Sequence, residues 1–272
     1  MEREPLKQVT VGGTGAGKSH GSMKFINEEY SNPRNPHARK TLIYDANFEF
    51  KDVKELLPEE IPAFNRQQAI EVRRILPVDF ETKKPLGMDD KYEMLCDIID
   101  NYSFKNGLLY LPDLNNYTTH GHTKHLVNLL TTNRHSLCDI YIELQTFGAL
   151  PPRLWGNINV LRMHKTIDDP FQAKIKSLLG GKVEPLRIAH LIVNEKTRTD
   201  EHFCLYVDFR KMKITGEFSM EDYVIACRQY LALNKPKVKE FANIYECSLQ
   251  DAKNRLIYRL VDDYNGNVKR KK

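Results

Sequence analysis

The chain lacks long apolar runs. No stretch of its 272 residues approaches 18 consecutive apolar residues, and its opening residues, MEREPLKQ, include no apolar segment. A membrane-spanning helix needs about 20 such residues and a secretory signal needs an apolar region near its start, so we expect neither. The five cysteines are isolated, with no Cys-x-x-Cys pair, which speaks against a zinc site or a disulfide framework. With no internal repeat and no low-complexity segment, we expect a soluble intracellular protein with one large domain plus an appendage.

An excess of charge of one sign is absent from most of the chain and is found only near its C-terminal end. Residues 235–272 carry ten basic and five acidic side chains, so they account for the whole formal net charge of +5 and the first 234 residues balance to zero. A contact with a polyanion is therefore expected near the C-terminus. The final residues, 269–272 (KRKK), fit this contact or, equally well, a solubilising tail.

The most informative motif that is present is GGTGAGKS at residues 12–19, which fits G-x-x-x-x-G-K-[ST] at every fixed position. Four glycines allow the backbone to bring several N–H groups close to one anion. The apolar run before the motif predicts a strand, and residues 18–30 predict a helix whose positive end points at the anion. This pattern predicts a nucleoside triphosphate site, with Lys18 on the β and γ phosphates and Ser19 on Mg²⁺. The expected nucleotide-binding residues are Gly12, Gly13, Thr14, Gly15, Ala16, Gly17, Lys18, Ser19 and His20.

Apolar runs alternate with helical patterns in the first two thirds of the chain, which predicts an α/β fold with a mainly parallel sheet covered by helices on both faces. The expected strands are 8–11, 41–44, 72–76, 107–111, 140–144 and 158–163. The expected helices are 18–30, 52–57, 88–102, 123–133 and 171–179. Alternating patterns then predict strands at 188–194, 203–209 and 213–218, which form a meander at the edge of the sheet.

The C-terminal region is expected to be helical, at 220–233, 238–245 and 249–262, with a break at Pro236. We therefore expect an ATP-binding domain at residues 1–219 and a helical region at 220–272. The last two helices have helix-turn-helix spacing, with Ser248 as an N-cap. Any pair of packed amphipathic helices gives the same pattern, so both interpretations stay open.

Acidic residues follow two of the expected strands. Asp45 and Glu49 lie in IYDANFEF, where acids face the phosphate end of such a site, although two solvated loop acids would look the same. Asp113 follows the apolar run GLLYL, where an unneeded charge is costly. Pro112 occupies the position of the expected magnesium-binding acid, and Asp113 that of the following catalytic acid. Either the register slips by one residue or Asp113 serves both tasks, so Asp113 and Asp45 are candidate metal ligands together with Ser19.

Two further polar residues flank the strand expected at 140–144. Gln145 follows it directly and can hydrogen-bond the γ-phosphate or the attacking water. Arg134 precedes it, where it can reach the γ-phosphate of a neighbouring subunit, although a surface arginine of little consequence is the alternative. The candidate catalytic residues are thus Lys18, Asp113, Glu49, Arg134 and Gln145.

Together, GGTGAGKS, the acids of IYDANFEF, the strand ending in Asp113, and NRHSLCDIYIELQ followed by LPPRLWGNINVL resemble the FtsK/HerA superfamily of P-loop ATPases with a RecA-like (ASCE) sheet. The order Arg-His, strand, Gln is most similar to the genome-packaging ATPases of double-jelly-roll viruses and phages. The resemblance covers residues 8–165, and Pro112 departs from the family pattern.

This resemblance implies a homo-oligomeric ring, hexameric or pentameric, that hydrolyses ATP with Mg²⁺ and translocates double-stranded DNA, in the host cytoplasm or associated with the virion. Portal or capsid-vertex proteins are the implied partners. The expected DNA-facing loop is 115–124, which carries His120, His122 and Lys124. Two other functions stay open: a DNA-export ATPase of filamentous-phage assembly or conjugation, and a slow nucleotide-dependent DNA-binding switch.

Overall fold

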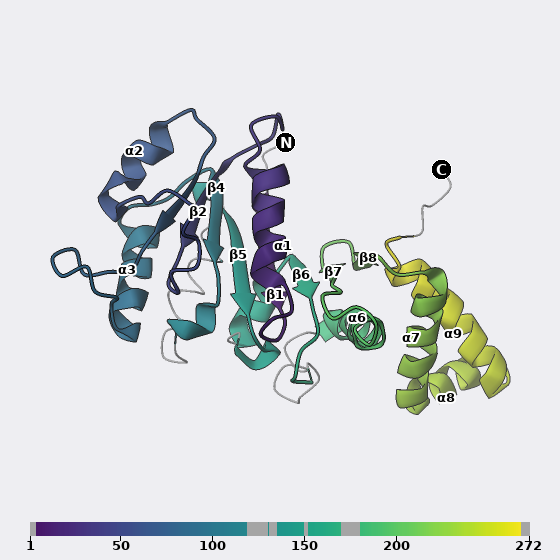
Figure 1. Ribbon diagram of the computed structural model, residues 1–272. Helices are drawn as coiled ribbons and strands as arrows, with labels where there is room; N and C mark the ends of the chain where they lie inside the picture. The colour runs from purple at the N-terminus through teal and green to yellow at the C-terminus, as the bar shows by residue number, and fades with distance from the viewer. Residues whose placement is uncertain (1–3, 119–129, 131–134, 150–151, 170–179, 268–272) are drawn as a thin grey trace. The chain divides into compact units, whose positions relative to one another are not determined.

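The computed structural model describes residues 4–118, 130, 135–149, 152–169 and 180–267 (Figure 1). Its strands are β1 (Lys7–Val11), β2 (Lys40–Tyr44), β3 (Val72–Ile75), β4 (Gly107–Leu111), β5 (Asp139–Leu144), β6 (Val160–Met163), β7 (Leu205–Asp208) and β8 (Lys213–Gly216). Its α-helices are α1 (Lys18–Phe25), α2 (Ile61–Arg66), α3 (Met88–Asp100), α6 (Val183–Lys196), α7 (Met220–Leu233), α8 (Lys235–Ile244) and α9 (Leu249–Tyr264).

The strands of the described residues form one sheet in the order β3-β2-β4-β5-β1-β6-β7-β8. β2 pairs in parallel with β3 and β4, and β4 pairs in parallel with β5. β6 pairs antiparallel with β7, and β7 with β8. Only β7 and β8 are joined by a short connection, as antiparallel neighbours can be. The mostly parallel sheet confirms the expected α/β class. The chain forms two compact units: residues 1–10 and 17–158 make the first, and residues 11–16 and 159–272 make the second.

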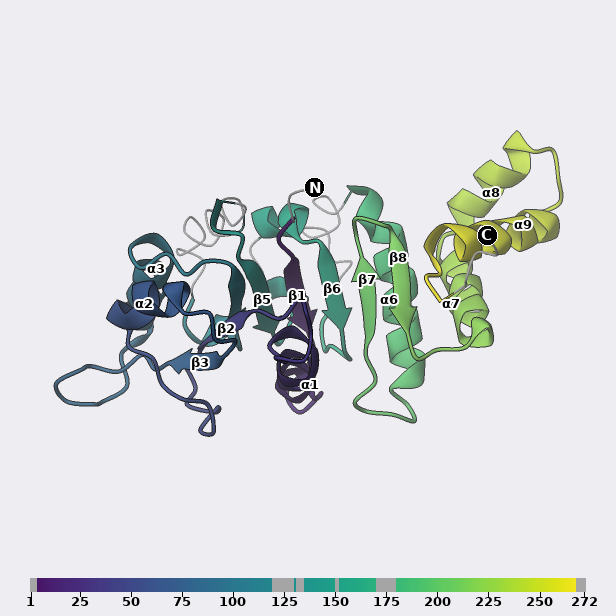
Figure 2. The ribbon, with the colours of Figure 1, turned by 90° about the horizontal axis from the view of Figure 1, so that it is seen from above.

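In the first unit, strands β2, β4 and β5 are buried along their whole length, as expected for parallel strands covered on both faces. Leu108 and Tyr110 of β4 and Tyr141 of β5 form a core with Ile26, which continues α1 as a π-helical turn (Ile26–Tyr30). On the other face, the Tyr44 hydroxyl donates a hydrogen bond to the Lys91 carbonyl of α3. Figure 2 shows α1 and α3 on opposite faces of these strands.

In the second unit, α6 packs against β6, β7 and β8, and α7 packs against α6 and α9. The Glu184 carboxylate of α6 accepts hydrogen bonds from Lys237 of α8 and from the Tyr264 hydroxyl of α9. Burial acts to raise the pKa of Glu184, but these hydrogen bonds outweigh burial and lower it. A half-buried, hydrogen-bonded carboxylate thus links three helices. The domain division at residues 219 and 220 stays a prediction.

Two of the expected elements are wrong. Residues 188–194 belong to helix α6 and not to a strand. The buried side chains of α6 recur every three or four residues, which is the spacing of one face of a helix. They are Leu186, Ile188, Ala189, Ile192 and Val193. Residues 52–57 form no helix; a 3₁₀ turn (Pro58–Glu60) and then α2 follow instead. The two prolines stand at the first or second position of these helical segments, where proline starts a helix and does not end one.

The remaining predicted elements within the described residues agree with the structure to within a few residues, while the helices expected at 123–133 and 171–179 lie almost entirely outside those residues. Ser248 caps α9, because its hydroxyl accepts a hydrogen bond from the backbone of Asp251. Glu246 supplies the turn between α8 and α9 with a positive φ of 46°. α8 and α9 pack against each other, as both interpretations of this helix pair require. In the described part of the chain, no helix is long and apolar enough to cross a membrane.

Candidate active site

The glycine-rich loop has the backbone that its sequence predicts. Gly15 and Gly17 have φ angles of 79° and 82°, in the left-handed region that favours glycine. A Cβ atom at Gly12 would lie 2.6 Å from the Cβ of His164, so only glycine lets the loop pass at this point. The Gly13 N–H donates a hydrogen bond of 2.8 Å to the Lys165 carbonyl. The loop is therefore held to the residues that follow β6.

Helix α1 begins at Lys18, directly after the loop. Its N-cap residue is Gly17, with φ 82° and ψ 16°, which has no side chain that could cap the helix. The first N–H groups of an α-helix have no acceptor within the helix, and the helix dipole favours an anion at that end. The Lys18 side chain is buried, with 7% of its surface exposed, whereas His20 and Thr14 are exposed. The start of α1 thus has the features of a phosphate site.

A buried carboxylate that we did not predict holds Ser19. The Ser19 hydroxyl donates a 2.8 Å hydrogen bond to Oε2 of Glu143, and the Ser22 hydroxyl donates a 2.6 Å bond to Oε1. Glu143 is on β5 and only 1% exposed. Burial, and then the Glu143 charge, raise the pKa of the neighbouring Tyr110 hydroxyl. The available signal was an acid inside an otherwise apolar strand, where a charge must have partners.

Asp45, a predicted metal ligand, contacts three protein groups in the structure, and its role on a metal stays a prediction. Asp45 is fully buried, and its two oxygens accept hydrogen bonds from the backbone N–H groups of Glu49 and Phe50 at 2.9 and 3.1 Å. Arg74 of β3 forms a 3.0 Å ion pair with the same carboxylate. These partners neutralise Asp45 and use both of its oxygens. The hydrogen bonds of the Asp45 carboxylate stabilise the turn that contains Glu49.

Asp113 is the second residue after the end of β4, and its backbone has φ 44° and ψ 50°. This left-handed conformation is rare except for glycine, asparagine and aspartate, whose short side chains can bond locally. Asn47 donates a 3.3 Å hydrogen bond to the Asp113 carboxylate. Asp113 is half-buried and therefore within reach of solvent, as a group that activates water must be.

Glu49 is electrostatically coupled to Asp113. The pKa of Glu49 is raised, first by the loss of surrounding water, then by the charge of Asp113, while a hydrogen bond from Asn47 acts the other way. The more distant charges of Asp45 and Glu143 raise the Glu49 pKa as well. Perturbed carboxyl groups of this kind are common at catalytic sites. Glu49 and Asp113 are thus close enough to interact electrostatically, and their catalytic roles stay predictions.

Of the remaining predicted catalytic residues, the structure describes only Gln145. Gln145 follows β5 directly and is half-buried, two residues after Glu143. Arg134, His120, His122 and Lys124 lie outside the described residues, so their predicted roles stay predictions.

The donor set fits magnesium. In the described part of the chain, no three His, Cys, Asp or Glu side chains are grouped to hold a metal ion. Mg²⁺ rarely needs such a cage, because it keeps several waters and uses one or two protein oxygens together with substrate phosphates. The Ser19 hydroxyl, hydrogen-bonded to Glu143, and the carboxylate of Asp113 are oxygen donors of this kind.

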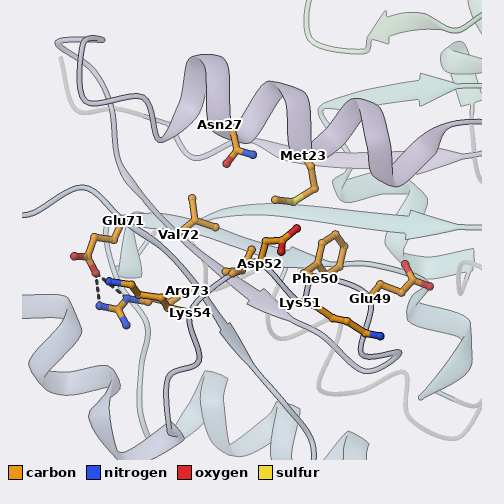
Figure 3. Close-up of a pocket in the computed structure, with 11 residues that line it drawn as sticks. Met23, Asn27, Glu49, Phe50, Lys51, Asp52, Lys54, Glu71, Val72 and Arg73 are labelled. Carbon is orange, nitrogen blue, oxygen red and sulfur yellow. Dashed lines mark hydrogen bonds and ion pairs between the residues drawn. The ribbon is translucent and has the colours of Figure 1, made fainter.

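A cavity of about 570 Å³ lies beside α1 (Figure 3). It is lined by Met23 of α1, by Asn27 of the π-helical turn that follows α1, and by residues 49–54 and 71–73. None of residues 12–19 is among its lining residues, so this cavity is distinct from the phosphate loop. Glu49 is at its margin, and its acidic and basic side chains are balanced, with Arg73 bound to Glu71.

The Glu49 titration is a direct check on this carboxylate pair. We expect the Glu49 midpoint, followed by carbon-13 NMR of its carboxyl group, to lie above its ordinary value of 4.5. In Asp113→Asn the midpoint should fall, because removing a nearby negative charge makes ionisation of Glu49 easier. Asp52→Asn, which removes an exposed charge from the same segment, should leave the midpoint in place. A wild-type midpoint at or below 4.5 would contradict the coupling.

No protein-family model and no curated protein sequence matches the chain significantly, but solved structures do. The genome packaging NTPase B204 from Sulfolobus turreted icosahedral virus 2, in complex with AMPPCP, matches with a TM-score of 0.54 and 15% identity, over 78% of this chain and 96% of that one. Its AMP complex matches at 0.54 and 17%, over 81% and 100%. B204, the DNA-packaging ATPase from Sulfolobus turreted icosahedral virus, matches at 0.51 and 14%, over 78% and 97%.

The chain has the P-loop NTPase fold. The predicted resemblance to genome-packaging ATPases is confirmed by this structural similarity, which at such low identity shows the fold alone. In P-loop NTPases, the loop Ser or Thr and an acid at a strand end hold Mg²⁺. The corresponding positions of this chain are occupied by Ser19 and Pro112.

Proposed function

We propose that the protein is an ATPase that forms a ring and translocates double-stranded DNA into a viral particle. The observation that carries this proposal is the glycine-rich loop leading into α1, with Ser19 held by the buried Glu143 and Asp113 at the end of the adjacent strand. The similarity to structures described as genome packaging NTPases, two of them bound to AMPPCP and AMP, supports nucleotide binding and the packaging role.

ATP would bind with its phosphates against the N–H groups of residues 12–19, and Lys18 would neutralise charge on the β and γ phosphates. Bound Mg²⁺ would supply further charge neutralisation, held on the protein side by Ser19. Asp113, assisted by Glu49, accepts a proton from the attacking water as its oxygen bonds to the γ-phosphorus. The bond to the β,γ-bridging oxygen breaks, and ADP and phosphate leave.

Two residues would couple this step to the ring. Gln145, placed after β5, would bind the γ-phosphate or the water and so report which nucleotide is present. Arg134 of one subunit would stabilise the charge that develops at the γ-phosphate of its neighbour. DNA would be held through its phosphates and without base readout, because a motor must accept every sequence that it passes. Residues 115–124 and the basic C-terminal region are the candidate contacts.

The test is ATP turnover measured with and without long linear duplex DNA at low salt. We expect duplex DNA to raise turnover several-fold and to do so less well as salt increases, because the contact is with phosphates. Single-stranded DNA of the same length is the matched control. Stimulation by single strands alone would favour a DNA-export motor, and turnover near background that ignores DNA would favour a nucleotide-dependent switch; either result would overturn the packaging role.

A further inference from the structure

The acid that is missing at Pro112 has a counterpart directly across the sheet. β4 and β5 pair in parallel with Leu108 opposite Asp139 and Leu111 opposite Ile142. Continued by one residue, the same register sets Pro112 opposite Glu143. Residues that are opposite in a parallel pair point to the same face of the sheet. Glu143 therefore stands one strand away from the position where the fold expects an acid.

Positions 112 and 143 are on the face of the sheet that α1 covers. Tyr110 of β4 and Tyr141 of β5 pack in one core cluster with Ile26, which continues α1. Side chains alternate along a strand, so positions 112 and 143, two residues further along, are on this face as well. The hydrogen bonds from Ser19 and Ser22 of α1 to Glu143 agree with that placement. A side chain at position 113 would continue toward the other face, but its left-handed backbone turns Asp113 toward Asn47.

The two hydrogen bonds give Glu143 a fixed orientation. Each of its oxygens accepts from a different serine hydroxyl, at 2.8 and 2.6 Å, and the side chain has almost no exposed surface. A hydroxyl has one hydrogen and two lone pairs. Because Ser19 donates its hydrogen to Glu143, its lone pairs are left for a cation on the opposite side. Outer partners of this kind orient the groups that bind a metal.

We propose that Glu143 replaces the strand-end acid absent at Pro112, acting as the positioning residue that orients Ser19 toward the magnesium of a bound Mg-nucleotide. The assignment rests on the proposed nucleotide binding. It removes the need for Asp113 to serve two tasks, because the metal side is served from β5 and Asp113 stays available to activate water. In this assignment the acid is on β5 instead of on the neighbouring strand β4. The glutamate side chain is one methylene group longer than that of aspartate, so it can extend further from its strand.

The test is calorimetric binding of a nonhydrolysable ATP analogue with Mg²⁺ and with EDTA, which needs no turnover. We expect Mg²⁺ to strengthen binding to the wild type. Glu143→Gln should lose about 10-fold or more of that Mg²⁺-dependent gain while keeping its affinity in EDTA, because the loop amides and Lys18 are intact. Glu143→Asp, which keeps the buried charge but shortens the side chain, should lose part of the gain. Glu29→Gln, on the exposed surface of the turn after α1, is the control.

A rescue variant separates positioning from a structural role. In Pro112→Asp/Glu143→Gln, the acid returns to the usual strand, and we expect the Mg²⁺-dependent gain to return with it. Ser19→Ala and Glu143→Gln should be non-additive, because one acts through the other. If the Mg²⁺-dependent gain survives in both Glu143 variants, the proposal is overturned while the proposed ATPase stands. If the wild type binds no nucleotide in either condition, the proposed ATPase fails and this assignment fails with it.

Discussion

Lys18→Ala is expected to reduce ATP turnover to background, a loss of about 10³-fold or more by comparison with the removal of single charge-stabilising donors in other active sites. Lys18 is the first residue of α1 and its side chain is buried at the end of the glycine-rich loop. A cation so placed is shielded from water, where its attraction to phosphate charge is strongest. Turnover measured as phosphate release, with nucleotide affinity measured alongside, gives the result.

Lys24→Ala is the matched control, because it removes the same charge from the exposed side of the same helix. Its turnover should equal that of the wild type. Lys18→Arg keeps the charge but not the shape, and is expected to recover only part of the activity. Wild-type turnover in Lys18→Ala would refute the phosphate loop and, with it, the proposed function.

Asp113→Asn is expected to slow turnover by about 10²- to 10⁴-fold, the range for loss of a positioned proton acceptor. Asparagine has the same shape as aspartate and tolerates the left-handed backbone of φ 44° that this position requires. The variant should therefore fold as the wild type does and bind nucleotide with similar affinity. Rapid-quench measurement of a single turnover separates the chemical step from binding and release.

The control for Asp113→Asn is Asp52→Asn, an equivalent loss of charge at an exposed position, which should leave turnover unchanged. A matching melting temperature for both variants would exclude a folding defect. If Asp113→Asn keeps full single-turnover rates, another group accepts the proton, and Glu49 is then the next residue to replace, since its raised pKa favours proton transfer.

The sequence predicted secondary structure correctly where interactions between neighbouring residues decide it. The apolar runs that became β2, β4 and β5 have no competing helical spacing, and the glycines of the loop serve one backbone conformation. Residues 188–194 were misassigned because their apolar positions suit both a strand and a helix, and only burial against β6, β7 and β8 selects the helix. The ion pair of Asp45 could not be predicted for a similar reason, since its partner Arg74 is 29 residues away in sequence.

The sequence by itself determined the glycine-rich loop, the α/β class, the strand that precedes Asp113 and the absence of the usual acid at Pro112, because each is encoded in neighbouring residues. Only the tertiary structure decided that Glu143 binds Ser19 and that Asp45 is engaged with Arg74. Glu143 is 124 residues from Ser19 along the chain. The pairing of β4 with β5 and the packing of α1 on that face bring the two together, and no local pattern records such a contact.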